Sequence, residues 1–268
     1  MKKLTIATVT AILVLISCRA IAREEVREDF KKYFDMFDVE GTFVLYDPQN
    51  DCHTFYDREL ADKGFIPAST FKIYNSLIGL ETGVISDKHH IIPWDKVRRS
   101  REVINKDQDL ESAFKNSALW YYQELARRVG QEQMNRWIDM LSYGNTDTSA
   151  GVDVFWIEGG MRISPIQQVN LLAKLRNNEL PFSLRSMDIV REIMISKSAA
   201  TCTLRTKTGW GDQDGKEVGW YVGYLETEGK VYYFAVCIQP KNTINENFAA
   251  ARIKIVDLIF NDLGLAKE

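Results

Sequence analysis

A serine and a lysine stand three residues apart in segment 67–72, which reads PASTFK. Apolar residues follow at helical spacing, so the segment is predicted to open a helix with Ser69 and Lys72 on the same side. Ser69 would lie near unpaired N–H groups and the positive end of the helix dipole, which suits a developing oxyanion. Lys72, desolvated by Phe71 and other apolar neighbours, would lose its proton readily and act as a base. Taken alone, the spacing also fits a serine that caps a helix and a solvated lysine.

A second candidate motif, KTG, occupies residues 207–209 on a predicted strand. Gly209 has no side chain, so another backbone or a ligand can approach closely. By itself the segment fits equally an exposed strand with a turn that starts at Gly209. A serine and a lysine three apart at the start of a helix, followed by KTG on a later strand, form the motif pair of serine β-lactamases and penicillin-binding proteins. The order and the structural context resemble that group.

The elements that must position these motifs are predicted from periodicity. We expect strands at 42–46, 52–56, 203–208, 218–225 and 231–238, and helices at about 71–80, 119–129, 134–141, 166–175 and 247–263. Strands thus open and close the chain, and a mostly helical block separates them. The predicted fold is α/β (α+β), an antiparallel sheet flanked by terminal helices with an inserted helical lobe. The sheet lobe is expected to span about 23–64 plus 200–268, the helical lobe about 65–199, and the cleft between them is the natural place for a site.

The composition is that of a globular protein. Of 268 residues, 45% are hydrophobic and 26% charged, and the formal net charge is -3 at pH 7. These values argue against a disordered chain and against a strongly basic nucleic-acid-binding surface. The run at 98–101, RRSR, is interpreted as a solvated face with acidic residues nearby.

The N-terminal residues 1–22 predict an export signal. Residues 1–3 are cationic, an apolar run covers 4–16, and Ala20 and Ala22 frame a cleavage site between small residues. The run is shorter than the roughly 20 residues of a membrane span, and no second apolar stretch follows. Cleavage after Ala22 would deliver a soluble periplasmic protein. Alternatively, segment 15–18 resembles a lipobox, in which case Cys18 would be lipidated and retained.

The sequence offers few residues for a metal site or for catalysis by histidine. The chain has no CxxC spacing, and its only histidines are His53, His89 and His90. No metal site is therefore expected, and a catalytic base other than histidine is favoured because the last two-thirds of the chain has none. The cysteines beyond the leader are Cys52, Cys202 and Cys237. At most one disulfide can form among them, and small buried side chains are the favoured interpretation for all three.

Further segments identify the family. SAL at 117–119 and YGN at 143–145 lie between the first motif and KTG, and segment 154–164 contains a tryptophan. This set and its order resemble the class D (oxacillinase-type) β-lactamases over essentially the whole mature chain. That family usually has valine at the last position of the motif that reads SAL here. Here Leu119 keeps the position apolar but adds a methylene, which bears on the efficiency of deacylation rather than on the type of reaction.

The resemblance implies catalytic roles for the matching residues. Ser69 is expected to attack the β-lactam carbonyl, and Lys72, carboxylated on Nζ by carbon dioxide, to serve as the general base. Ser117 is expected to relay a proton to the departing ring nitrogen, with Lys207 lowering the energy of nearby anions. The backbone N–H groups of Ser69 and Trp210 would form the oxyanion hole.

The remaining matches imply binding and supporting roles. Substrate is expected at Thr208, Gly209, Trp210 and Arg252, and its carboxylate at Thr208 and Arg252. Trp156 would donate its indole N–H to the carboxylated lysine. The residues expected to keep that group dry or to shape the wall of the site are Phe71, Leu119, Ile157, Tyr143 and Asn145.

The expected activity is hydrolysis of penicillins of the oxacillin type through a serine acyl-enzyme, which would confer antibiotic resistance. Carbon dioxide is the only added group implied, a β-lactam antibiotic is the partner, and the assembly is a monomer or a homodimer. Two alternatives stay open. A penicillin-sensing domain shares these motifs and stays acylated, usually as the extracellular part of a membrane receptor. A penicillin-binding peptidase matches the YGN segment and the short length poorly.

Overall fold

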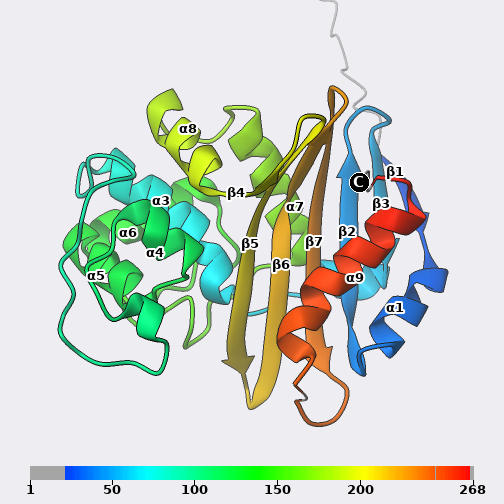
Figure 1. Ribbon diagram of the computed structural model, residues 1–268, viewed down its shortest axis with the longest axis horizontal. Coiled ribbons are helices and arrows are strands. Elements are labelled where there is room, and N and C mark those ends of the chain that lie inside the picture. Colours follow the sequence, from blue (N-terminus) through cyan, green and yellow to red (C-terminus); the bar gives the residue numbers. More distant parts are fainter. Residues whose placement is uncertain (1–21, 245, 266–268) are drawn as a thin grey trace, which may run out of the picture.

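The computed structural model describes residues 22–244 and 246–265. Except for Ala22, the predicted leader and its Cys18 lie outside the described residues. One seven-stranded sheet forms in the order β1-β3-β2-β7-β6-β5-β4, and its strands lie side by side across Figure 1. Its strands are β1 (Arg23–Val26), β2 (Val39–Asp47), β3 (Cys52–Tyr56), β4 (Ile195–Ser198), β5 (Cys202–Gln213), β6 (Lys216–Thr227) and β7 (Lys230–Pro240).

The two ends of the chain meet in this sheet. β2 pairs antiparallel with β7, for example through Phe43 and Val236. β1 runs parallel to β3, and the other neighbouring pairs are antiparallel. The predicted fold class is confirmed, with the N-terminal strand as the one parallel addition.

Helices cover the sheet and fill the inserted block. They are α1 (Lys31–Asp35), α2 (Arg58–Asp62), α3 (Lys72–Glu81), α4 (Leu110–Lys115), α5 (Leu119–Val129), α6 (Gln131–Leu141), α7 (Pro165–Arg176), α8 (Leu184–Ile193) and α9 (Phe248–Asp262). In Figure 1, α1 and α9 pack against the sheet, while α3, α4, α5, α6 and α8 lie beside β4 and β5. None of the helices in the described ranges is both long and apolar enough to span a membrane.

The sheet is buried on both faces because successive side chains of a strand point to opposite sides. On β2, Phe43 and Leu45 pack in the apolar cluster that includes α1 and α9. Val44, between them, packs in the larger cluster that extends through α7 into the inserted helices. The central strands are therefore fixed in register, and β5, near one edge, is held rigidly beside the inserted helices.

Three local features differ from the sequence-based expectations. The first motif begins in a short 3-10 helix, η2 (Ala68–Phe71), and the α-helix starts only at Lys72. β5 does not turn at Gly209 but continues to Gln213. The exposed short strands β1 and β4, and helices α1, α2, α4 and α8, were not expected.

Candidate active site

Ser69 and Lys72 lie in contact at the junction between η2 and α3. Lys72 Nζ donates a hydrogen bond to Ser69 Oγ at 2.5 Å. The turn before them is tight, because Ala68 has a φ of 49°, a left-handed conformation that residues with a side chain rarely adopt. The Ala68 N–H donates to the Trp156 carbonyl at 2.8 Å. The loop that carries Trp156 therefore holds the turn that presents Ser69.

Lys72 is enclosed by apolar groups. Lys72 is only 1% exposed, and its Nζ lies 5.5 Å from the centre of the Tyr122 ring. Burial holds the pKa of Lys72 well below 10.5, and the positive charges of Lys207 and Arg101 act in the same direction. No acidic side chain among the described residues forms an ion pair with it. Burial therefore favours the neutral form of the amine that lies beside the serine hydroxyl.

An aromatic cluster forms the dry wall behind this pair. Phe71 stacks on Trp156, with ring centres 5.4 Å apart, and contacts Phe155 and Tyr143 edge-on. Trp156 is fully buried, and its Nε1 has no hydrogen-bond partner among the described residues. A buried indole N–H without an acceptor is costly, so this site would favour an acceptor group that reached it.

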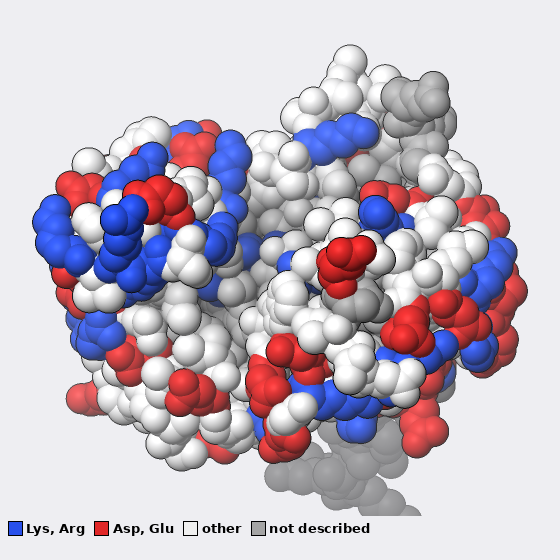
Figure 2. Space-filling model, turned by 60° about the horizontal axis from the view of Figure 1, so that its bottom comes forward, with Lys and Arg blue, Asp and Glu red and all other residues white. Residues whose placement is uncertain are grey.

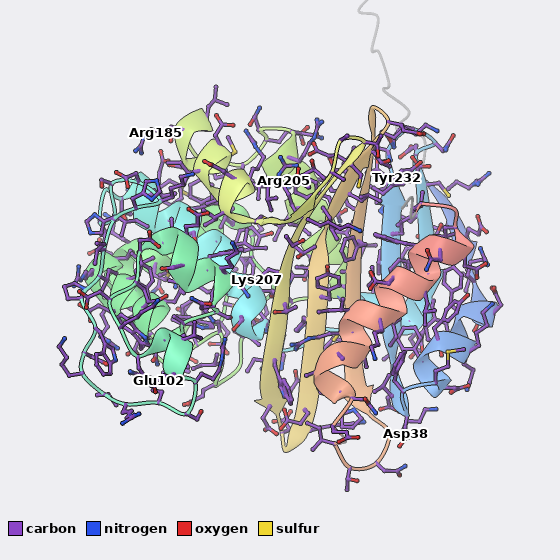
Figure 3. All side chains as sticks on the ribbon, in the orientation of Figure 1. Asp38, Glu102, Arg185, Arg205, Lys207 and Tyr232 are labelled. Carbon is purple, nitrogen blue, oxygen red and sulfur yellow. The ribbon has the colours of Figure 1, made fainter. Side chains whose placement is uncertain are left out.

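The SAL motif and the KTG motif contact each other across the site. Lys207 Nζ donates to Ser117 Oγ at 3.2 Å and to the Thr208 carbonyl at 3.1 Å. Figure 3 places Lys207 between β5 and the inserted helices. Burial, followed by the charges of Arg252 and Arg101, lowers the pKa of Lys207 to about 7. This lysine can exchange a proton with Ser117 near neutral pH.

β5 and α9 build the opposite wall. The Arg252 guanidinium donates to the Gly209 carbonyl and lies 5.6 Å from the centre of the Trp210 ring. Burial lowers the pKa of Arg252 to about 10. A Cβ on Gly209 would lie 3.1 Å from Thr70 Cγ2 and 3.2 Å from the Pro67 carbonyl oxygen. The glycine therefore lets β5 approach η2 closely enough to share one cavity with Ser69.

The cavity has a volume of about 390 Å³. Its lining residues are Ser69, Arg101, Lys115, Asn116, Ser117, Thr208, Gly209, Trp210 and Arg252. Six of the predicted site residues are thus brought together at one opening, and Lys72 and Lys207 contact its two serines. Figure 2 shows a hollow between the two parts of the molecule, with Lys and Arg side chains gathered along its rim.

Arg101 and Lys115 were not singled out from the sequence as site residues. Arg101 belongs to the run that was interpreted as a solvated face; it is exposed, as expected, and it also lines the cavity. Lys115 ends α4, two residues before Ser117. Its position next to the SAL motif was the available signal.

The other predicted wall residues lie behind the cavity. Tyr143 is fully buried against Phe71 and Tyr74, at 5.2 and 4.9 Å between ring centres. Leu119 and Ile157 are half-buried against the same apolar cluster. None of them lines the opening, so they act on the site through packing.

Asn145 ties two loops together. Its side chain donates to the Gly160 carbonyl at 2.8 Å and accepts from the Arg162 N–H at 2.9 Å. Its own N–H donates to the Arg162 carbonyl at 2.9 Å. These bonds close the loop that carries Trp156.

The cysteines and histidines stay apart from the site. Cys52, Cys202 and Cys237 are all unpaired. In the described ranges, no group of three His, Cys, Asp or Glu side chains is arranged to hold a metal ion.

Comparison with known proteins agrees with this geometry. Residues 41–263 match the penicillin binding protein transpeptidase domain family. The probable beta-lactamase YbxI of Bacillus subtilis (strain 168) is 39% identical over 239 residues, which cover 89% of this chain and 87% of that protein. A solved class D β-lactamase, YbXI from Nostoc, is 40% identical with a TM-score of 0.85, covering 88% of this chain and 99% of that one. The chain belongs to the class D β-lactamases.

This class D β-lactamase is also similar to a second hydrolase and to a receptor domain. Beta-lactamase OXA-48 of Klebsiella pneumoniae is 35% identical over 237 residues, covering 88% of this chain and 89% of that protein. The C-terminal domain of the Bacillus licheniformis BlaR penicillin receptor is 31% identical with a TM-score of 0.86, covering 92% of this chain and 98% of that one. The same fold thus occurs in both hydrolases and receptors.

Proposed function

We propose that this class D β-lactamase hydrolyses the β-lactam amide of penicillins through an acyl-enzyme on Ser69, with Lys72 carboxylated on Nζ as the general base. The observation that carries the proposal is the contact of 2.5 Å between Lys72 Nζ and Ser69 Oγ, made by a lysine that is 1% exposed. A neutral, dry amine is the form that carbon dioxide can modify, and the modified side chain would then lie beside the nucleophile as its base.

Acylation uses groups on both walls. The carboxylate carried by Lys72 takes the proton from Ser69 Oγ, which bonds to the β-lactam carbonyl carbon while the charge moves to the carbonyl oxygen. The N–H groups of Ser69 and Trp210 are proposed to stabilise that oxygen. The ring C–N bond then breaks, and Ser117, hydrogen-bonded to Lys207, delivers the proton to the departing nitrogen.

The substrate carboxylate is proposed to bind Thr208 and Arg252. Both line the cavity, and the guanidinium is held in place by its bond to the Gly209 carbonyl. Trp210 is 41% exposed beside them and offers an apolar surface to the substrate. This arrangement fixes the carbonyl carbon near Ser69.

Carboxylation of Lys72 needs a neutral amine, which bonds to the carbon of carbon dioxide and releases one proton. The lowered pKa of Lys72 and the unpartnered indole N–H of Trp156 both support it. The added group supplies a stronger proton acceptor than an ammonium. In deacylation the same side chain is proposed to take a proton from water, which attacks the acyl carbon and releases Ser69.

A penicillin receptor is the second candidate, favoured by the likeness to the BlaR domain. Such a protein would be acylated at Ser69 and would not turn over. The half-buried Leu119 bears on this choice, because its extra methylene narrows the space for the deacylating water.

Hydrolysis of a chromogenic cephalosporin tests the proposal. We expect sustained turnover that rises with added bicarbonate and is abolished in Ser69→Ala. The Lys72→Ala variant should be acylated at Ser69 and should hydrolyse the acyl group slowly at most. A burst of one product per protein molecule, with no further hydrolysis at any bicarbonate concentration, would support the receptor instead. Lys72→Ala with wild-type turnover would refute the proposed base.

A further inference from the structure

The active-site cavity contains more positive charge than a simple penicillin can neutralise. Arg101, Lys115 and Arg252 line it, and no acidic residue does. The whole chain nevertheless carries a net charge of -3. The positive charge is therefore a local property of this opening, and Figure 2 shows it as Lys and Arg side chains beside the hollow.

The arginines of segment 98–101 are not equivalent. Arg98 pairs with Glu102 at 3.4 Å, and Arg99 pairs with Asp95 at 2.6 Å. Arg101 lines the cavity and forms no ion pair with any described acidic residue. Lys115, which also lines the cavity, forms none either. Unpaired cations that line a binding cavity are available to an anionic ligand.

The charge balance leaves two cations without a partner. The carboxylate of a penicillin nucleus supplies one negative charge against the three positive side chains of the lining, whereas Lys72 lies behind Ser69, near Lys207 and outside that lining. Thr208 and Arg252, on β5 and α9, take the nucleus carboxylate. The surplus lies on the other wall, at Arg101 before η3 (Glu102–Ile104) and Lys115 at the end of α4.

We infer that this site selects β-lactams with a second carboxylate on the acyl side chain, which Arg101 and Lys115 hold. The inference rests on the proposed function and names its substrate class. Arg101 is a specificity-determining residue here, since it contacts a substituent and not the reacting atoms. A charged pair at a partly solvated rim is screened by salt, so the preference is strongest at low ionic strength.

The test compares two penicillins that differ by one carboxylate, α-carboxybenzylpenicillin and benzylpenicillin. The readout is the ratio of their second-order rate constants for acylation of Ser69, which does not depend on deacylation. In Arg101→Gln we expect this ratio to fall by about fivefold to tenfold through weaker binding. In Arg101→Glu it falls further. Added salt lowers the ratio in the wild type, lowers it less in Arg101→Gln, and raises it in Arg101→Glu, where salt screens a repulsion.

Arg98→Gln is the matched control, because it removes a positive charge from the same segment outside the cavity. Its ratio should stay within about twofold of the wild-type ratio. Ratios in Arg101→Gln and Arg101→Glu equal to the wild-type value would overturn the inference while leaving the proposed function intact. Failure of both penicillins to acylate Ser69 would overturn both.

Discussion

Lys72 and Lys207 are nearly inaccessible to water, at 1% and 5% exposure. An ammonium ion in such a position loses its hydration, and neither lysine gains an acidic partner among the described residues. Each is therefore driven toward its neutral form, and each contacts a serine hydroxyl. The chemistry of the site follows from where these two amines are buried rather than from their residue type alone.

The buried state of Lys207 predicts a pH dependence of stability. Its pKa falls from 10.5 to about 7 on folding. Between these values the unfolded chain holds a proton that the folded chain has released, so folding becomes more favourable as the pH rises through this window. One such group adds at most about 1.4 kcal/mol per pH unit.

Urea unfolding between pH 7 and pH 9 measures this slope. Lys207→Met removes the titrating group while keeping a long apolar side chain, so its free energy of unfolding should rise less with pH than that of the wild type. Equal slopes in the two proteins would show that Lys207 keeps its proton in the folded state.

At the scale of elements, loops hold the catalytic turn as firmly as helices do. The Trp156 carbonyl binds the Ala68 N–H, and Asn145 binds Gly160 and Arg162 in the same loop. Gly144 is needed beside it, because a Cβ there would lie 2.0 Å from the Arg162 carbonyl oxygen. The YGN segment thus stabilises the Trp156 loop and does not line the cavity.

Asn145→Ala tests this role. The variant loses three side-chain hydrogen bonds, to Gly160, Arg162 and Asp147, and we expect the free energy of unfolding to fall by about 1–2 kcal/mol. Because the Trp156 loop loosens, more bicarbonate should be needed for half-maximal activity. Gln49→Ala is the control, since the Gln49 side chain makes two hydrogen bonds to the Val231 backbone, away from that loop. An unchanged bicarbonate requirement in Asn145→Ala would contradict the assigned role.

At the scale of the molecule, the site is assembled where the inserted helices meet the sheet. Ser69 and Ser117 come from the inserted part, Thr208 and Trp210 from β5, and Arg252 from α9. No single motif contains all the residues that line the cavity. A change that separates β5 from η2 therefore disables the site without altering any reacting group.

The sequence predicted the fold class because long segments have clear periodicity. Helix α5 begins and ends at the expected residues, 119 and 129. β1 and β4 were missed because they are short and exposed throughout, so they show no alternation of apolar and polar residues. α8 did carry a signal, with the buried Met187, Val190 and Ile193 at helical spacing after a serine cap.

The cavity was predictable only in part. Ser69, Ser117, Thr208, Gly209, Trp210 and Arg252 were found through motifs and do line it. Arg101 was not, because the backbone of an irregular loop decides which of three neighbouring arginines faces the site. The supporting role of Asn145 was likewise invisible, since it depends on a loop that lies fifteen residues further along the chain.

A carbon NMR spectrum recorded in isotopically labelled bicarbonate is the most direct measurement. The active wild-type protein should give one carbamate resonance, which disappears in Lys72→Ala and needs more bicarbonate in Trp156→Phe. On acidification the resonance and the hydrolysis of penicillin should fall together and return together when bicarbonate is added. A protein that hydrolyses penicillin at its full rate and shows no carbamate resonance would contradict the role assigned to Lys72.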